Sequence, residues 1–265
     1  LLLKVLSPTW CLFCMHLLTI ILGALTATLA FSVLCDYISP TVSAIWLSAG
    51  VFQPMWSSQL AGVYLEIPVA FVIVACFYFV HRKQWAFAML VCLFGYCFKN
   101  SVFLLSLALL VFFVFRLVLW GLVLRRPKSD YFRRRQIYLI VPFIIHVFLW
   151  PASNSSFSSS VISRIAIYVD YIPDLLVVFV SYFVSVFLTL SLSKSRSQFV
   201  DRVEDFDDLA LWSTFIFGFV VAWFIHPIPV IRYWVGVTLP LCLGLGVLLT
   251  RLLGPRISGV IAAFL

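Results

Sequence analysis

Long apolar runs alternate with short charged or polar stretches along most of this chain. A helix needs about 20 apolar residues to cross the hydrocarbon core of a bilayer. The runs therefore predict an all-α fold, a polytopic transmembrane helix bundle with eight to nine spans. The predicted spans cover residues 13–34, 42–60, 64–81, 101–124, 137–151, 165–191, 209–226 and 233–250, with a shorter run at 85–98 and the start of another helix after residue 256.

The charged stretches between the runs predict an orientation. Stretches 125–136, 194–208 and 251–256 carry most of the Lys and Arg residues, and loops rich in these residues stay in the cytoplasm. The Ser-rich stretch 152–160 and the stretch 226–232 then both lie on the outer side. The basic residues of the first cytoplasmic loop are Arg125, Arg126, Lys128, Arg133, Arg134 and Arg135.

The composition excludes a soluble globular protein. The chain is 64% hydrophobic and 11% charged, whereas soluble domains are roughly 45–50% apolar and about 25% charged. The net charge of +8 is concentrated at helix ends, which indicates cytoplasmic loops and not a nucleic-acid site. Cys11 and Cys14 form a CxxC, but no second CxxC or His pair accompanies them, so we expect no metal and no cofactor.

Tryptophans gather near the ends of the predicted spans. Membrane proteins place such residues in belts at the two membrane–water interfaces. The pattern therefore predicts interface positions for most of Trp46, Trp56, Trp85, Trp120, Trp150, Trp212 and Trp234.

Ionisable residues inside apolar runs are the candidates for function, because a charge at the centre of a membrane helix costs about 2.5–3.5 kcal/mol on insertion scales. Asp170 and Asp174 are four residues apart, so they share one helix face. Pro173 lies between them and, having no N–H, favours a kink in that helix. Glu66 begins another span on the same outer side, and Arg116 lies inside the run 101–124.

Two interpretations of these residues stay open. In the first, Glu66, Asp170 and Asp174 line a polar pocket for a ligand, ion or proton, with the kink at Pro173 beside it. In the second, Asp170 caps its helix near the interface and Asp174 pairs with an arginine. Arg116 either neutralises one of the carboxylates or extends toward the cytoplasmic side.

No catalytic motif occurs in the sequence. GxSxG, P-loop, HExxH and dinucleotide-binding patterns are all absent, so the residues given are not expected to form an enzyme. The chain begins without Met and ends inside an apolar run, so an enzymatic domain in a longer parent protein stays open.

Six segments follow one another in a distinctive order from residue 63 onward. They are LEIPVAF (65–71), HRKQW (81–85), LFGYCFKN (93–100), LVLRRP (122–127), YVDYIPDLLVVF (168–179) and TLPLCLGLGVLLTRLLGPRISG (238–259). This order resembles a bacterial membrane-associated sensor domain, the first type found ahead of cyclic-di-GMP synthase, phosphodiesterase or histidine kinase modules. The resemblance implies N-terminal helices at 1–62, a sensor-like bundle at 63–265, and two further helices and an output module beyond residue 265.

The leading hypothesis is thus a sensory and anchoring domain of the bacterial inner membrane that relays an envelope or membrane signal to a cytoplasmic output. Its expected partners are the lipid bilayer, a membrane or periplasmic protein, and a second copy in a homodimer. One alternative is a transporter or channel subunit that uses the same carboxylates for protons or cations. Another is a membrane component of envelope glycan synthesis.

Overall fold

The computed structural model describes residues 8–52, 54–62, 64–99, 102–118, 134–149 and 235–264. Every regular element in these residues is a helix, which confirms the all-α prediction. The helices are α2 (Pro8–Cys35), α3 (Pro40–Val51), α4 (Pro54–Ala61), α5 (Glu66–His81), α6 (Trp85–Gly95), α7 (Phe103–Val118), the 3₁₀ helix η3 (Arg134–Leu139), α9 (Val141–Leu149), α14 (Val235–Leu253) and α15 (Pro255–Phe264).

The chain divides into two compact units by its internal contacts. One unit consists of Leu1–Tyr78 and Ile231–Leu265, and the other of Phe79–Val230. The division into 1–62 and 63–265 follows the resemblance described above and stays a prediction.

Helix α2 is the long apolar helix predicted at 13–34. Its 28 residues rise about 42 Å at 1.5 Å per residue, which exceeds a hydrocarbon core of about 30 Å. The buried side of α2 consists mostly of small side chains, which let neighbouring helices approach closely. The buried residues are Cys11, Thr19, Leu22, Gly23, Thr26, Ala30, Val33 and Leu34.

The prediction of one helix over 42–60 is wrong, because two shorter helices, α3 and α4, occupy this stretch. Each of them begins with a proline, Pro40 and Pro54. Proline suits the first turn of a helix, but inside a helix it removes a hydrogen bond and clashes with the preceding turn. Pro54 therefore ends one helix and starts the next.

The predicted basic turn 251–256 contains a single non-helical residue, Gly254, with φ of +85°. Its N–H donates to the carbonyl of Thr250 at 3.0 Å. Glycine is favoured at this left-handed position because it has no side chain to clash. The two basic residues thus lie in helix ends, Arg251 in the last turn of α14 and Arg256 in the first turn of α15.

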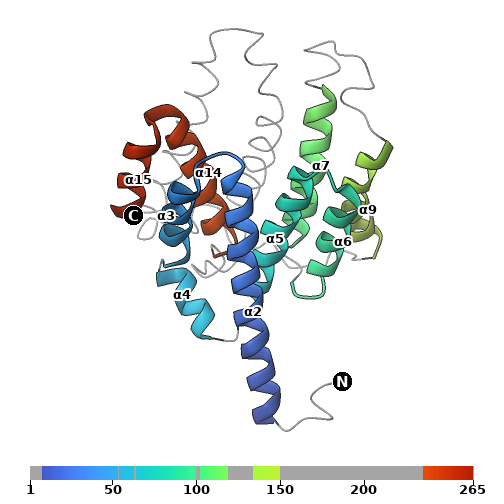
Figure 1. Cartoon of the computed structure of the whole chain (residues 1–265). Helices are drawn as coiled ribbons and strands as arrows, with labels where there is room; N and C mark the ends of the chain where they lie inside the picture. The colour runs from blue at the N-terminus through green and yellow to red at the C-terminus, as the bar shows by residue number, and fades with distance from the viewer. Residues whose placement is uncertain are drawn as a thin grey trace, which may run out of the picture. The chain divides into compact units, whose positions relative to one another are not determined.

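Helix α3 is central to the unit that holds both ends of the chain. It packs against α2, α4, α14 and α15, and α14 also packs against α15. Figure 1 shows the red C-terminal helices beside the blue α3, although they come from opposite ends of the sequence. The core of this unit is therefore built by segments that are far apart in the chain.

In the unit Phe79–Val230, α6 packs against η3 and α9, and α7 packs against the same two elements. Helix α6 has 11 residues, which agrees with the predicted short run at 85–98. The predicted span 137–151 starts as η3 and becomes α-helical only from Val141. Pro142 explains the change, because it lacks the N–H that an α-helix would use there.

Among the described residues, α2 is the one helix that is both long and apolar enough to cross a membrane. Several other described helices are apolar but shorter. The predicted spans 165–191 and 209–226 lie outside the described residues. The number of eight to nine spans thus stays a prediction.

Candidate functional site

Glu66 is the predicted pocket residue whose surroundings the structure describes. It is the first residue of α5, and its side chain is 6% exposed. A carboxylate at this position is favoured by the free N–H groups and the positive dipole end of the helix. The side chain is nevertheless enclosed by protein, which an ordinary helix-capping carboxylate does not require.

Two segments meet at Gly23, in the middle of α2. A Cβ at Gly23 would lie 2.6 Å from Cδ2 of Leu60 and 3.7 Å from Cγ2 of Ile67. The missing side chain of Gly23 therefore makes room for both residues. Leu60 follows Gln59, and Ile67 follows Glu66, so the end of α4 and the start of α5 both lie against this part of α2.

Gln59, the residue before Leu60, is also a buried polar residue. Its side chain is 8% exposed, and its Oε1 accepts no hydrogen bond from the residues that the structure describes. A buried acceptor without a donor costs roughly 1–3 kcal/mol. The amide oxygen of Gln59 is an acceptor, so its chemistry suits a cation or a hydrogen-bond donor, and the carboxyl group of Glu66 also carries acceptor oxygens.

The other predicted pocket residues are not described in atomic detail. Arg116 lies in α7, of which the backbone is described at this position, so its role as a counter-ion stays a prediction. Asp170, Pro173 and Asp174 lie outside the described residues. Of the basic loop residues, Arg134 and Arg135 lie in η3, and Arg125, Arg126, Lys128 and Arg133 are outside the described residues.

A second polar cluster joins α3, α14 and α15. The indole N–H of Trp46 donates to Oγ of Ser258 at 2.9 Å. Oγ of Ser258 is 2.7 Å from Oγ1 of Thr250, and either hydroxyl can be the donor. Trp46 and Ser258 are both 0% exposed. These hydrogen bonds satisfy the polar atoms of Trp46 and Ser258 in the interior, whereas Thr250 is partly exposed.

Glycines bring the helices around Trp46 together. A Cβ at Gly246 of α14 would lie 2.7 Å from Cγ and 2.8 Å from Cδ2 of the Trp46 ring. A Cβ at Gly50 of α3 would lie 2.8 Å from Cδ1 of Leu239. Each helix therefore carries a glycine where the other helix presents a bulky side chain.

The interface-belt prediction is wrong for Trp46, and the burial of Trp56 and Trp85 contradicts it as well. A belt tryptophan keeps its ring among lipid headgroups, whereas these rings are packed inside the protein. The sequence signal for the Trp46 cluster is the small-residue pair Gly246 and Thr250, which are four residues apart and so share one face of α14.

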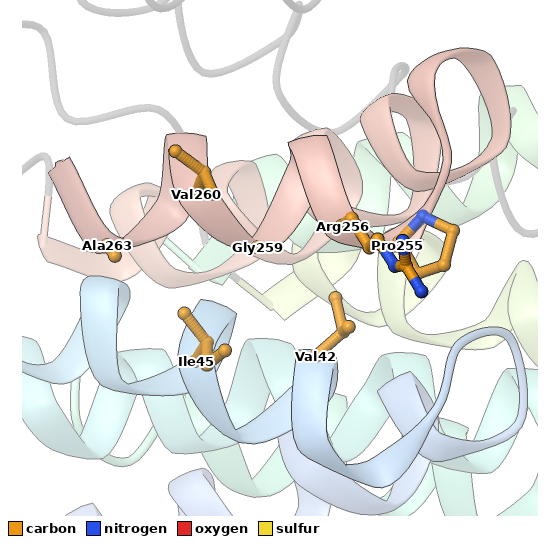
Figure 2. Close-up of a pocket in the computed structure, with 7 residues that line it drawn as sticks. All are labelled: Val42, Ile45, Pro255, Arg256, Gly259, Val260 and Ala263. Atoms are coloured by element: carbon orange, nitrogen blue, oxygen red, sulfur yellow. The ribbon is translucent and has the colours of Figure 1, made fainter.

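An open groove of about 370 Å³ runs between α3 and α15 (Figure 2). In this view Val42 and Ile45 point from α3 toward α15. Pro255 and Arg256 lie together at one end of the groove. The lining is apolar except for Arg256 and consists of Val42, Ile45, Pro255, Arg256, Gly259, Val260 and Ala263.

In the unit Phe79–Val230, an aromatic cluster surrounds His146. Its ring stacks on Phe103 with centroids 4.3 Å apart and on Tyr96 with centroids 5.1 Å apart. The hydroxyl of Tyr96 donates to Oγ of Ser106 at 2.8 Å, and Ser106 donates to the carbonyl of Phe103 at 2.8 Å. The cluster connects α9 with α7 and with Tyr96, the residue that follows α6.

The described residues contain no group of three or more His, Cys, Asp or Glu side chains that could hold a metal ion. Comparison with known proteins found no matching family model, no matching curated protein and no matching solved structure. The function is therefore inferred from the chemistry of the chain's own residues.

Proposed function

We propose that this chain is a sensory and anchoring domain of the bacterial inner membrane, which relays an envelope or membrane signal to a cytoplasmic output module. The order of sequence features from residue 63 onward supports this proposal. The observation that carries it is the pair of buried acceptor groups, Glu66 and Gln59 Oε1, at the end of α4 and the start of α5.

The exposed side of α2 supports membrane embedding. Contiguous apolar surface of this extent is rare on soluble monomers, because it would associate or aggregate in water. A bilayer covers such a surface at no cost. The large apolar side chains exposed along α2 are Trp10, Leu12, Phe13, Met15, Leu17, Leu18, Ile20, Ile21 and Leu25.

The threonines of α2 are compatible with lipid around this helix. Thr19, Thr26 and Thr28 each donate a hydrogen bond to the carbonyl four residues earlier, at distances of 2.9, 2.6 and 2.9 Å. A hydroxyl that is satisfied within its own helix needs no water or neighbouring partner. The threonine hydroxyls are therefore compatible with hydrocarbon around this helix.

The remaining spans complete the proposed bundle of eight to nine. Helices α3 and α4 together rise about 30 Å at 1.5 Å per residue, so the broken pair replaces the single span predicted at 42–60. Breaks of this kind occur in membrane proteins where other helices cover the backbone. The packing of α2, α14 and α15 against α3 supports the placement of α3 within the bundle.

The proposed mechanism is a population shift. A signal can drive a change only if it binds one helix packing better than another. A cationic or hydrogen-bond-donating ligand at Glu66 and Gln59 would stabilise one arrangement of α4 and α5 against α2. The predicted kink at Pro173, with Asp170 and Asp174, provides a second element that such a ligand can move.

The first test is membrane integration. Membranes that contain the full chain are washed with sodium carbonate at high pH, and the chain is expected to stay in the pellet. Release into the supernatant would contradict the proposal.

The second test is the signal response. Glu66→Gln and the double substitution Asp170→Asn/Asp174→Asn are introduced into the gene at its own locus, so that whatever follows residue 265 stays attached. The cellular cyclic-di-GMP level and histidine kinase phosphorylation are then measured. We expect at least one of these outputs to change in the Glu66→Gln strain, while Asp36→Asn serves as the carboxylate control. Unchanged outputs in both mutant strains would contradict a sensing role for this pocket.

The same two acceptors also suit a cation pathway, so a transporter is the second candidate. Proton and sodium flux into proteoliposomes containing the purified chain separates the two functions. A sensor gives no flux above empty liposomes, whereas flux that Glu66→Gln abolishes would favour the transporter.

A further inference from the structure

The groove between α3 and α15 is suited to a hydrocarbon chain. All of its lining residues except Arg256 are apolar. Gly259 leaves space there, because a Cβ at this position would have Cδ1 of Ile45, at 3.7 Å, as its nearest neighbour. The volume of about 370 Å³ falls within the range of roughly 300–1,000 Å³ typical of small-molecule sites.

The groove lies on a helix that also exposes apolar side chains. Ile257, Val260 and Phe264 of α15 are all exposed. Their spacing of three and four residues places them along one side of the helix. Contact with hydrocarbon is favourable for a row of exposed apolar side chains.

One end of the groove is positively charged. Arg256 is exposed there and forms no ion pair within the part of the chain that the structure describes. The neighbouring basic residue, Arg251, is placed differently, because its guanidinium carbon lies 5.6 Å from the centroid of the Tyr37 ring. A guanidinium group binds phosphate oxygens through two parallel hydrogen bonds, so Arg256 is complementary to a phosphate group.

We propose that this groove binds one anionic phospholipid, with an acyl chain between α3 and α15 and the phosphate at Arg256. A phospholipid uses the apolar groove and the cation together, whereas a free phosphate uses only the cation. The predicted orientation places 251–256 at the cytoplasmic surface, where anionic headgroups attract basic residues. The inference rests on the membrane placement in the proposed function and is independent of the sensing role.

The test is lipid binding to the full chain, purified in a neutral detergent and measured by native mass spectrometry. The probes are dioleoylphosphatidylglycerol and dioleoylphosphatidylcholine. We expect one tightly bound lipid and about tenfold higher affinity for phosphatidylglycerol. Both lipids carry the phosphate, but the positively charged choline group of phosphatidylcholine is repelled by Arg256 and offsets the attraction. Arg256→Gln should reduce the two affinities to similar values, because it removes the headgroup contact and keeps the groove.

A second variant addresses the groove without changing charge. Gly259→Leu places a side chain in the acyl-chain position and should weaken both lipids at least tenfold. If this variant does not fold, Gly259→Ala is the substitute, because its Cβ fits at van der Waals distance and should weaken both lipids to a smaller degree. Arg82→Gln, a loss of charge in the other unit, and Ala24→Leu, an added side chain on exposed α2, are the matched controls.

Three results would overturn the proposal. Equal affinities for the two lipids, unchanged by Arg256→Gln, would mean that lipids only surround the helices without selectivity. Displacement of phosphatidylglycerol by an equal concentration of inorganic phosphate would mean an anion site without an acyl chain. Dissociation of a dimer by Gly259→Leu, with lipid binding intact, would mean that a second copy covers the groove. Release of the wild-type chain from carbonate-washed membranes is a separate result and contradicts the proposed function itself.

Discussion

The two compact units bury their aromatic and polar side chains in different ways. In the unit that holds both chain ends, Trp46 is hydrogen-bonded to Ser258, 212 positions away, and its ring lies against Gly246. In the unit Phe79–Val230, the ring of His146 stacks between Tyr96 and Phe103. The hydrogen bonds of that cluster join residues only ten and three positions apart.

The difference indicates how each unit tolerates change. Around Trp46, α3 meets α14 and α15 from the other end of the chain at a large ring, and Gly246 allows the closest contact. Around His146, rings stack between neighbouring helices and retain other contacts when one ring is lost. We therefore expect larger effects of substitution at the Trp46 cluster than at the His146 cluster.

The largest effect is expected for Trp46→Ala. Truncating a fully buried tryptophan leaves a cavity and typically costs about 3–5 kcal/mol in the free energy of unfolding. It also removes the donor to Ser258. The measurement is chemical denaturation in detergent, followed by size-exclusion chromatography of the folded fraction. A cost below about 1 kcal/mol would show that Trp46 does not hold the three helices together.

The next largest effect is expected for Gly246→Ala. The new Cβ would lie 2.7 Å from the Trp46 ring, and overpacking of this kind typically costs about 1–3 kcal/mol. Gly259→Ala is the control, because its Cβ would have 3.7 Å to its nearest neighbour. The melting temperature should fall for Gly246→Ala and stay within a few degrees of wild type for Gly259→Ala. Equal shifts would contradict the close approach at Trp46.

An effect no larger than that of Gly246→Ala is expected for His146→Ala in the other unit, because this side chain is partly exposed whereas Gly246 is buried. It removes two ring contacts, each worth about 0.5–1.5 kcal/mol for aromatic pairs. His146→Phe keeps both contacts and should restore most of the loss. If His146→Phe is as destabilising as His146→Ala, the imidazole nitrogens, and not ring stacking, contribute the stability.

The smallest effects are expected for two matched single hydrogen-bond losses, Thr250→Val and Tyr96→Phe. Each removes one hydroxyl partner, while Ser258 keeps its bond to Trp46 and Ser106 keeps its bond to the Phe103 carbonyl. Each should lower the unfolding free energy by about 1 kcal/mol. A clearly larger loss for Thr250→Val would indicate that the hydrogen bonds of the Trp46 cluster strengthen one another.

Much of the helix pattern was predictable, and the errors have local causes. The apolar run at 13–34 is long enough to specify one helix, and α2 confirms it. The run at 42–60 contains Pro54, which divides it into two helices. The run at 137–151 contains Pro142, and its first residues form a 3₁₀ helix. Proline marks the break or the change of helix type at Pro54 and Pro142, whereas α14 continues through Pro240, so proline alone does not predict a break.

The candidate site was predictable only in part. Glu66 stands out in the sequence because it is a lone carboxylate at the start of an apolar run. Gln59 does not stand out, because a neutral amide near a helix end is common. Its importance depends on the approach of Leu60 and Ile67 to Gly23, which involves residues on three helices.

The sequence by itself determined the helical class and the turn at 251–256, because those signals act within a few residues. Only the tertiary structure decided which side of α2 is buried and that Trp46 lies in the interior. A helix that is apolar on all sides carries no pattern that marks its buried face. Burial is then set by the helices that pack against it, which are α3, α4 and α14.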